Sequence, residues 1–336
     1  MANIHEVARR AGVSIATVSR VFSRPDAVAV NTRRKVMQAV SQLGYAPNSA
    51  GKHLRTQKSG RILVIVPDIS NPFYSRILQS IEETAQREGY AVLLGDTQQD
   101  VTREERYTQM LRRREAEGLI VLGHGLSEAA MAISEELPAG APIVTGCEVN
   151  RGVNIPSVHI DNHAAAADAM EHLYDLGHRR IGIVTGPMVS ALSRDRLQGA
   201  TARAKAHKAD RDVVVVNGDF TIESGRAAAE RLLDRRDPPT ALFCFNDQMA
   251  IGAMNVVRSL GLQVPRDVSV VGFDDISFAR YTSPPLTTIA QPVREMGQET
   301  VRLLLGMINR ESMAPVSVIL RHALVVREST AAPPRR

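Results

Sequence analysis

The sequence is poor in sulfur and in aromatic side chains, and both shortages narrow the kind of protein it encodes. Trp is absent and aromatic residues make up 4% of the 336 residues, so a core has to be built from Val, Ile, Leu, Ala and Met. The cysteines are Cys147 and Cys244, too few for a disulfide framework and not spaced as metal ligands are. This usage fits a protein of the reducing cytoplasm.

Long apolar runs are also missing from the sequence. No stretch approaches the roughly 20 apolar residues that a bilayer span requires. The first residues, MANIHEVARRAG, lack the apolar segment of a signal peptide. The composition, 44% hydrophobic and 23% charged, excludes a fibrous or largely disordered chain. We therefore expect a cytoplasmic protein of two or three folding units with no membrane partner.

Charge is distributed unevenly along the chain, although the net charge of the whole is only +5. Residues 1–60 hold ten Lys and Arg residues against two acids, a net charge of +8, and the remainder has a net charge of −3. A basic head on a slightly acidic body predicts a nucleic-acid-binding module joined to a domain with a different task.

The basic head is predicted to contain three short helices. Their expected ranges and N-caps are 4–11 after Asn3, 15–22 after Ser14 and 32–43 after Asn31. Ala8, Gly12 and Val18 have the spacing of a helix-turn-helix: the small residue lets two helices approach, the glycine permits the turn, and the valine packs back on the first helix. The second helix of such a motif enters the major groove of DNA. The alternative is a basic three-helix cap that binds nothing.

The segments GVSIATVSRV and LGYAPN resemble the lactose-repressor family of bacterial transcription regulators, and the resemblance extends to about Thr330. It implies that Ile15, Ala16 and Arg20 face base edges, with Arg20 able to make a bidentate contact with guanine. It also implies contacts with phosphates for a second set of residues, Ser14, Thr17, Ser19, Asn31 and Thr32. For Ser14 and Asn31, helix capping alone is the alternative, and both roles are compatible.

Residues 47–60 contain few apolar side chains and, taken alone, indicate a flexible basic linker. In the resembled family this stretch becomes a short hinge helix on operator DNA, and one helix from each subunit inserts a leucine into the minor groove. Leu54 matches that leucine. We therefore expect a DNA-binding domain over residues 1–46 and a hinge over residues 47–60.

From Arg61 onward the chain alternates short β-branched runs with longer helical stretches, which is the pattern of parallel sheets covered on both faces. The runs are too many for one sheet, so we predict an effector-binding core over 61–330 made of two doubly wound α/β lobes. The resemblance implies that this core is like a periplasmic binding protein. The expected lobes are 61–160 plus 290–316 and 161–289 plus 317–330, followed by a disordered tail at 331–336.

Ligands of such sheets bind beyond the carboxyl ends of the strands, in the cleft between lobes. The residues expected at these ends and in the loops after them include Asp68, Phe73, Arg194, Arg196, Phe220, Asn246 and Asp274. Acids, amides, arginines and aromatic rings together suit a polyhydroxylated ring. The resemblance assigns effector contacts to Arg196, Asn246 and Asp274, and it adds Phe220 and Gln291 to the same pocket. Helix capping is the alternative for Asn246 and Asp274, and ordinary core packing is the alternative for Phe220.

The stretches ILVIVPDISNPF and GDFTIESG resemble the nucleoside-responsive members of the family, which implies a nucleoside or related sugar as effector. A plain monosaccharide or sugar acid is the alternative. The sequence contains no phosphate loop, nucleophile elbow or zinc-protease helix, so we expect a regulator without cofactor or metal. A sugar- or nucleoside-converting enzyme, or a solute-binding protein without a DNA role, are the competing hypotheses. Because the chain ends without a heptad repeat, the expected assembly is a homodimer on a pseudo-palindromic operator.

Overall fold

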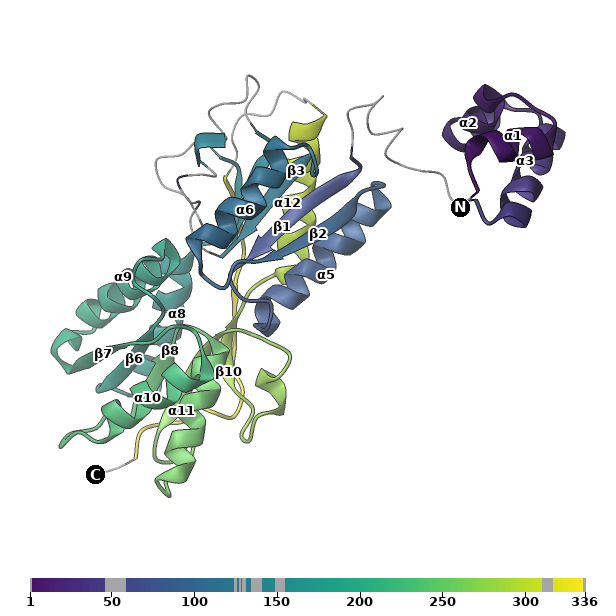
Figure 1. Ribbon diagram of the computed structural model, residues 1–336. Coiled ribbons are helices and arrows are strands. Elements are labelled where there is room, and N and C mark those ends of the chain that lie inside the picture. The colour runs from purple at the N-terminus through teal and green to yellow at the C-terminus, as the bar shows by residue number, and fades with distance from the viewer. Residues whose placement is uncertain are drawn as a thin grey trace. The chain divides into compact units, whose positions relative to one another are not determined.

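The computed structural model describes residues 2–45, 59–123, 126, 128, 131–133, 141–148, 155–309 and 317–334. The chain divides into two compact units, residues 1–58 and residues 59–336, drawn in Figure 1. Leu54 and nearly all of the expected hinge lie outside the described residues.

The first unit is helical. Its elements are α1 (Ile4–Ala11), α2 (Ile15–Ser23), the 3-10 turn η1 (Pro25–Ala27) and α3 (Val30–Leu43). The predicted N-cap of α1 is confirmed as a capping box: the Asn3 side chain accepts from the Glu6 nitrogen at 3.0 Å, and the Glu6 carboxylate accepts from the Asn3 nitrogen at 3.1 Å. The helices share a small core to which Val7, Val18 and Val36 contribute fully buried side chains.

The turn between α1 and α2 is set by Gly12, whose φ of 64° lies in the left-handed region that favours glycine. Ala8 is 5% exposed and Val18 is fully buried, so the small and aliphatic residues flanking this turn pack as the spacing predicts. The helix-turn-helix geometry of this unit therefore follows from the small side chain of Ala8, the left-handed backbone of Gly12 and the buried side chain of Val18.

The start of α3 corrects the sequence-based prediction. The helix begins at Val30 rather than Thr32, and its N-cap is Ala29, which makes no side-chain hydrogen bond. Asn31 lies inside the first turn, where its side-chain oxygen accepts from the Arg34 guanidinium instead of capping the helix. The first turn is exposed, so water can satisfy its free N–H groups and no side-chain cap is required.

The first lobe of the larger unit is built around a six-stranded sheet in the order β11-β5-β4-β3-β1-β2, parallel throughout the described residues. Helix α6 covers one face of the sheet, and α5 with α12 covers the other (Figure 1). Its elements are β1 (Arg61–Val66), α5 (Pro72–Arg87), β2 (Ala91–Asp96), α6 (Val101–Arg112), β3 (Gly118–Leu122), β4 (Ile143–Gly146), β5 (Ser157–Ile160), α12 (Val293–Ile308) and β11 (Ser317–Leu320).

Strand β1 shows why these strands are apolar throughout. Leu63 and Ile65 face the cluster that includes Leu111 of α6, whereas Ile62 and Val64 face the cluster that includes residues of α5 and α12. Because both faces are covered, successive side chains are all buried and the usual alternation of apolar and polar residues disappears.

The second lobe repeats this plan with the order β12-β10-β9-β8-β6-β7, in which only the β10–β12 pairing of the described strands is antiparallel. Helices α8 and α9 pack together, as do α10 and α11. The elements are α8 (Asn162–Asp175), β6 (Ile181–Thr185), α9 (Ala191–Ala206), η2 (Asp210–Asp212), β7 (Val213–Asn217), α10 (Ile222–Leu233), β8 (Ala241–Cys244), α11 (Asp247–Ser259), β9 (Ser269–Asp274), η3 (Ala279–Tyr281), β10 (Thr287–Ala290) and β12 (Ala323–Val325).

Two details correct the expected lobe boundaries. Strand β11 belongs to the first sheet, where it pairs with β5. The chain therefore passes from the first lobe to the second for the last time at residues 321–322, and not before residue 317. A side-chain hydrogen bond of 3.2 Å between Ser157 and Ser317 supports this pairing. The tail was expected to be disordered from residue 331, but the backbone of Ala331 forms hydrogen bonds with the side chains of Ser269 and His178. The predicted architecture of two doubly wound lobes is otherwise confirmed.

Candidate functional site

Helix α2 presents one exposed face and one buried face. Val18 and Val21 are buried against the other helices, whereas Ile15, Ala16 and Arg20 are exposed on the opposite side. The Arg20 guanidinium makes no hydrogen bond or ion pair with any described residue, which leaves all of its donors available. A short helix with a free arginine and small or aliphatic neighbours has the shape and chemistry to enter a major groove.

The polar residues around α2 are partly committed to the fold. The Ser14 side chain caps α2 by accepting from the Thr17 nitrogen at 3.1 Å, and the two hydroxyls lie 2.9 Å apart. Capping keeps both hydroxyls at the exposed start of the helix, where a phosphate would meet the N-terminal N–H groups. Ser19 is half-buried on the same helix, and Thr32 is half-buried in the first turn of α3.

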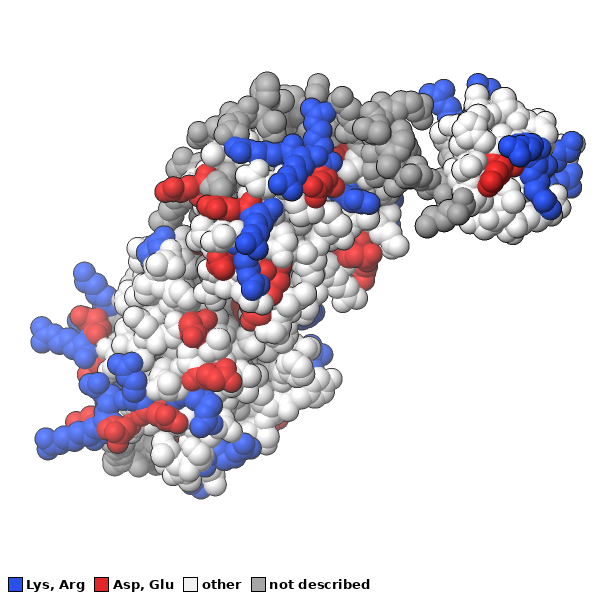
Figure 2. Space-filling view, viewed as in Figure 1, with Lys and Arg blue, Asp and Glu red and all other residues white. Residues whose placement is uncertain are grey.

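The surface charge of the first unit matches its composition. On the face shown in Figure 2, most of the charged groups of this unit are Lys or Arg, whereas the larger unit mixes both signs. Positive charge of this kind attracts the phosphate backbone without regard to sequence and makes binding salt-dependent.

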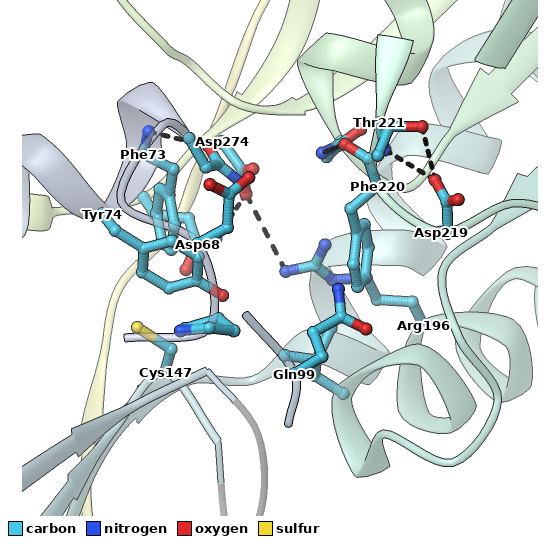
Figure 3. Close-up of a pocket in the computed structure, with 15 residues that line it drawn as sticks. Asp68, Phe73, Tyr74, Gln99, Cys147, Arg196, Asp219, Phe220, Thr221 and Asp274 are labelled. Carbon is cyan, nitrogen blue, oxygen red and sulfur yellow. Dashed lines mark hydrogen bonds and ion pairs between the residues drawn. The ribbon is translucent and has the colours of Figure 1, made fainter. Parts of the chain in front are cut away.

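A second candidate site lies between the two lobes, at the carboxyl ends of their strands (Figure 3). Both sheets have the strand order 2-1-3-4-5 of doubly wound folds, whose ligands bind where that order reverses. The cavity has a volume of about 60 Å³. It is lined by Pro67, Asp68, Asn71, Phe73, Tyr74, Gln99, Cys147, Leu192, Arg196, Asp219, Phe220, Thr221, Asn246, Asp274 and Gln291.

Most residues predicted for this pocket do meet there, and one does not. The structure brings together Asp68, Phe73, Arg196, Phe220, Asn246, Asp274 and Gln291. Arg194 is outside the lining, because its guanidinium donates to the backbone oxygens of Met188 and Val189 at 2.9 and 2.6 Å. Residues two apart on a helix differ by about 200° in direction, so Arg194 and Arg196 point to opposite sides of α9.

Arg196 is the most enclosed charge in the pocket, with 4% of its surface exposed. Its Nε donates to the Asn162 side chain at 2.8 Å, and its Nη1 donates to the Phe245 backbone oxygen. The guanidinium lies 3.6 Å from the centre of the Phe273 ring. These contacts from three separate segments of the chain fix the planar fork so that Nη2 is directed toward Asp274 at 3.9 Å, as Figure 3 shows.

Asp274 is buried beside Arg196 and accepts a 2.7 Å hydrogen bond from the Gln291 amide. Burial raises the pKa of Asp274 to about 7, while Arg196 and the Gln291 hydrogen bond oppose that rise. Its backbone φ of 108° is unusual for a residue with a side chain and occurs often at functional positions. A buried carboxyl next to a guanidinium and an amide offers several directed partners for ligand hydroxyls.

Asn246 caps a helix, which was the alternative interpretation of this residue in the sequence analysis. Its side-chain oxygen accepts from the Met249 nitrogen and caps α11, and its amide nitrogen donates to the Phe220 backbone oxygen, both at 2.8 Å. The second contact holds Phe220, whose φ is 73° and whose ring lies against Gly186. A Cβ at Gly186 would approach that ring to 2.0 Å, so the glycine is what allows the ring to occupy this position.

Several lining residues were missed by the sequence analysis. Tyr74 follows Phe73 in the first turn of α5, and Figure 3 shows its hydroxyl and the Arg196 guanidinium directed into the same space from opposite lobes. Burial raises the pKa of Tyr74, so its hydroxyl remains a donor. Asp219 and Thr221 are bonded to each other beside Phe220, a turn that the run GDFT signals. Gln99 comes from the loop after β2, which no motif marks.

The described lining of the pocket offers neither a cluster of metal ligands nor a reactive thiol. Cys147 is 5% exposed, and burial raises the pKa of its thiol. Within the described residues, no group of three His, Cys, Asp or Glu side chains is placed to hold a metal ion. Among the described helices, none has the length and apolarity that crossing a membrane demands.

Comparison with known proteins agrees with this geometry. Residues 3–48 match the family described as bacterial regulatory proteins, lacI family, and residues 170–330 match a periplasmic binding protein-like domain. The chain is 40% identical over 335 residues to the HTH-type transcriptional repressor CytR of Escherichia coli strain K12, covering 99% of this chain and 97% of that protein.

Solved structures are similar over nearly the whole chain. The lac repressor dimer bound to operator and the anti-inducer ONPF is similar with a TM-score of 0.89 and 30% identity, over 98% of this chain and 99% of that one. The complex of the transcriptional regulator CelR with cellobiose is similar with a TM-score of 0.74 and 32% identity, over 98% and 100%. The chain belongs to the lacI family of bacterial regulatory proteins, whose members matched here are DNA-binding transcriptional regulators and not enzymes.

Proposed function

We propose that this chain binds a pseudo-palindromic operator as a homodimer, and that a nucleoside or sugar bound between its lobes changes its affinity for DNA. The observation that carries the proposal is the buried Arg196–Asp274 pair, which lies at a pocket walled by both lobes in a chain whose other unit exposes α2. The proposal gives DNA binding to residues 1–46, the hinge to 47–60 and effector binding to 61–330.

On DNA, Ile15, Ala16 and Arg20 read base edges in the major groove. The exposure of all three on one face of α2 supports this assignment. We assign the phosphate contacts to Ser14 and Thr17 at the start of α2, to Ser19 in the middle of that helix, and to Asn31 and Thr32 in the first turn of α3. Leu54 inserts into the minor groove at the centre of the operator. Contact with chromosomal DNA places the protein in the cytoplasm.

In the pocket, a hydroxylated ring is held by the charged and amide groups around Arg196, and Phe73 and Phe220 cover its faces. One relative supports a ligand of this class, because the similar structure of the transcriptional regulator CelR is a complex with cellobiose. Asp68 and Tyr74 belong to the first lobe, whereas Arg196 and Asp274 belong to the second. A ligand that contacts both therefore binds one lobe arrangement better than another, which is what a linkage to DNA affinity requires.

A second copy of the chain is expected to bind through the larger unit. Phe278 and Tyr281 near η3 are 57% and 79% exposed, an unusual position for aromatic rings in a chain that has so few. The operator-bound lac repressor is a dimer, which supports the same assembly here.

The test begins with operator sequences selected from random duplexes by the full-length chain. We expect a two-fold symmetric consensus bound by two chains, with an affinity that changes at least tenfold when one member of a nucleoside and sugar panel is added. A consensus without symmetry, a complex with one chain, or chemical turnover of the added ligand would each contradict the proposal.

A further inference from the structure

One edge of the sheet in the second lobe is open. Strand β7 (Val213–Asn217) stands last in the order β12-β10-β9-β8-β6-β7, so it pairs with β6 and with no other described strand, and Figure 1 shows it at one side of the lobe. β7 has five residues, whereas β12 at the opposite edge has three. An edge strand of this length presents a row of free backbone groups to which a further strand can pair.

The direction of the backbone groups of β7 follows from its pairing with β6. The Gly218 nitrogen donates to the Thr185 oxygen of β6 at 2.9 Å. Backbone groups alternate in direction along a strand, so those of every second residue before Gly218 also point to β6. The N–H and C=O groups of Val213, Val215 and Asn217 therefore point away from the sheet. No hydrogen bond joins these outward groups to a residue that the structure describes.

The side chains of β7 give no protection against strand pairing. Edge strands of soluble proteins are commonly protected by a lysine, a proline or a bulge. β7 has the sequence VVVVN and pairs with β6 without a bulge. Val215 at its centre is 42% exposed, although β-branched side chains of this kind favour a position between two strands. The edge therefore has both free backbone groups and side chains suited to another strand.

This edge is complementary to a second copy of itself. An antiparallel pair of β7 strands with its two-fold axis at Val215 places Val213 of each strand opposite Asn217 of the other. These residues all have outward backbone groups, so each opposed pair can exchange two hydrogen bonds. Arg211 lies four residues before Val215 and Asp219 four residues after it, and both are exposed. The same axis therefore brings opposite charges toward each other at both ends of the paired strands.

We propose that β7 is a second self-association surface, at which two copies of the chain pair their β7 edges and join their sheets. This surface is distinct from the contact expected near η3, because η3 lies between β9 and β10, and β8 and β6 separate those strands from β7. A dimer carries two β7 edges, so this pairing joins dimers into assemblies of four chains or more. The contact is small, and we expect its dissociation constant to be on the order of tens of micromolar.

Sedimentation of the full-length chain from about 1 µM to about 200 µM tests the proposal, because this range includes the expected dissociation constant. The average mass of the wild type should at least double across the range. Val215→Pro removes an outward N–H that the fold does not use, so its mass should stay constant. Val215→Lys places like charges opposite each other and should also stay constant. Val326→Lys, at a 58% exposed valine outside β7, is the matched control and should associate as the wild type does.

The charges at the ends of the strand are tested separately. Arg211→Glu would face Asp219 of the other copy, so the association should weaken at least about threefold. Arg235→Glu makes the same change of charge at another exposed arginine and should leave the association unchanged. Equal weakening in both variants would overturn the proposed register, because net charge and not the position of Arg211 would then control the association.

Crosslinking adds a measurement in which the strand keeps all of its backbone groups. Cys147 and Cys244 are both buried, so a short bismaleimide should react with a cysteine introduced at the surface. It should join copies of Val215→Cys and leave copies of Val326→Cys without this link. A wild-type mass that does not change with concentration, a mass of Val215→Pro that rises like that of the wild type, or equal crosslinking of the two cysteine variants would each overturn the proposal.

Discussion

The carboxylate of Glu148, which follows β4 in the first lobe, accepts a 2.6 Å hydrogen bond from the backbone nitrogen of Ala191, the first residue of α9 in the second lobe. The Ser190 hydroxyl donates to the same carboxylate at 3.3 Å. Glu148 is 3% exposed, so the acid of one lobe caps the helix of the other inside the protein. Because α9 also carries Arg196, this contact joins the arrangement of the lobes to the pocket.

The Glu148 contact predicts a pH dependence of stability. Burial raises the pKa of Glu148 to about 7, although the bonds from Ala191 and Ser190 oppose the rise. A carboxyl whose pKa is raised on folding stabilises the fold below its unfolded value, and that stability is lost as the pH rises from about 4.5 to about 7. Glu148→Gln should therefore gain up to about 3 kcal/mol relative to the wild type between pH 5 and pH 8.

Thermal or urea unfolding of both proteins across this range measures the difference. Burial lowers the pKa values of His172 and His178 in both proteins, which makes stability rise with pH. This contribution cancels when the unfolding free energy of the wild type is subtracted from that of the variant. Glu88→Gln, at an exposed acid, is the control and should leave the stability at pH 7 within about 0.5 kcal/mol of the wild type. A Glu148→Gln difference that does not change with pH would show that the contact does not titrate in this range.

Arg196 is expected to control ligand binding without controlling DNA binding. Arg196→Lys keeps the charge beside Asp274 but loses the planar fork that reaches Asn162 and Phe245, so effector affinity should fall at least tenfold. Arg196→Ala would also leave Asp274 buried without its partner, at a cost of about 3–5 kcal/mol in stability. Calorimetry with the effector and anisotropy with operator DNA measure the two activities.

Arg194→Lys is the matched control for that prediction, because Arg194 lies two residues away on the same helix and bonds only to loop carbonyls outside the pocket. It should change effector affinity by less than threefold. Equal losses in the two variants would place the ligand elsewhere than beside the Arg196–Asp274 pair.

Arg20 is expected to supply sequence specificity. Arg20→Ala should reduce the ratio of specific to random DNA affinity by about 1–3 kcal/mol, since a bidentate contact with guanine is lost. Lys35→Ala removes the same charge from an exposed position on α3 and should weaken binding to both DNAs alike. Competition binding at fixed salt measures the ratio, and an unchanged ratio in Arg20→Ala would exclude this residue as a base reader.

Features coded by neighbouring residues were predicted well from the sequence. The N-cap of α1 at Asn3 and the bounds of α1 follow from residues close together in the sequence, and the structure has both as expected. The strands of the larger unit were also recognisable, because a buried parallel strand is apolar at every position. The start of α3 was not, since the Asn31 oxygen bonds to Arg34 in preference to the backbone, a competition between two local partners.

Features that depend on distant partners were predicted less well. The run around Val318 signals a strand, but its place in the first sheet depends on pairing with β5, which lies 160 residues earlier at Ser157. Gln99 is part of the pocket only because the loop after β2 turns toward the cleft. Arg194, in contrast, could have been left out of the pocket from the sequence alone. Arg196 occupies the face of α9 that points into the pocket, and a residue two positions away on a helix points to the other side.

Gly199 is expected to be indispensable for the packing of α9, although an alanine at this position would favour an isolated helix by about 1 kcal/mol. A Cβ on Gly199 would lie 2.0 Å from the backbone oxygen of His163 in α8, and a backbone atom cannot rotate away as a side chain can. Gly199→Ala should therefore force α8 and α9 apart and destabilise the second lobe by about 1–3 kcal/mol. Because Arg196 lies on α9 and bonds to Asn162 on α8, effector affinity should fall as well.

Urea unfolding and effector titration of the same variant test both parts of this prediction. Thr201→Ala, at an exposed position on α9, is the control and should leave stability within about 0.5 kcal/mol of the wild type. If Gly199→Ala were as stable as the control, α8 and α9 would have to tolerate a wider separation than the structure has. If stability fell while effector affinity did not, the bond between Arg196 and Asn162 would contribute to the fold and not to the geometry of the pocket.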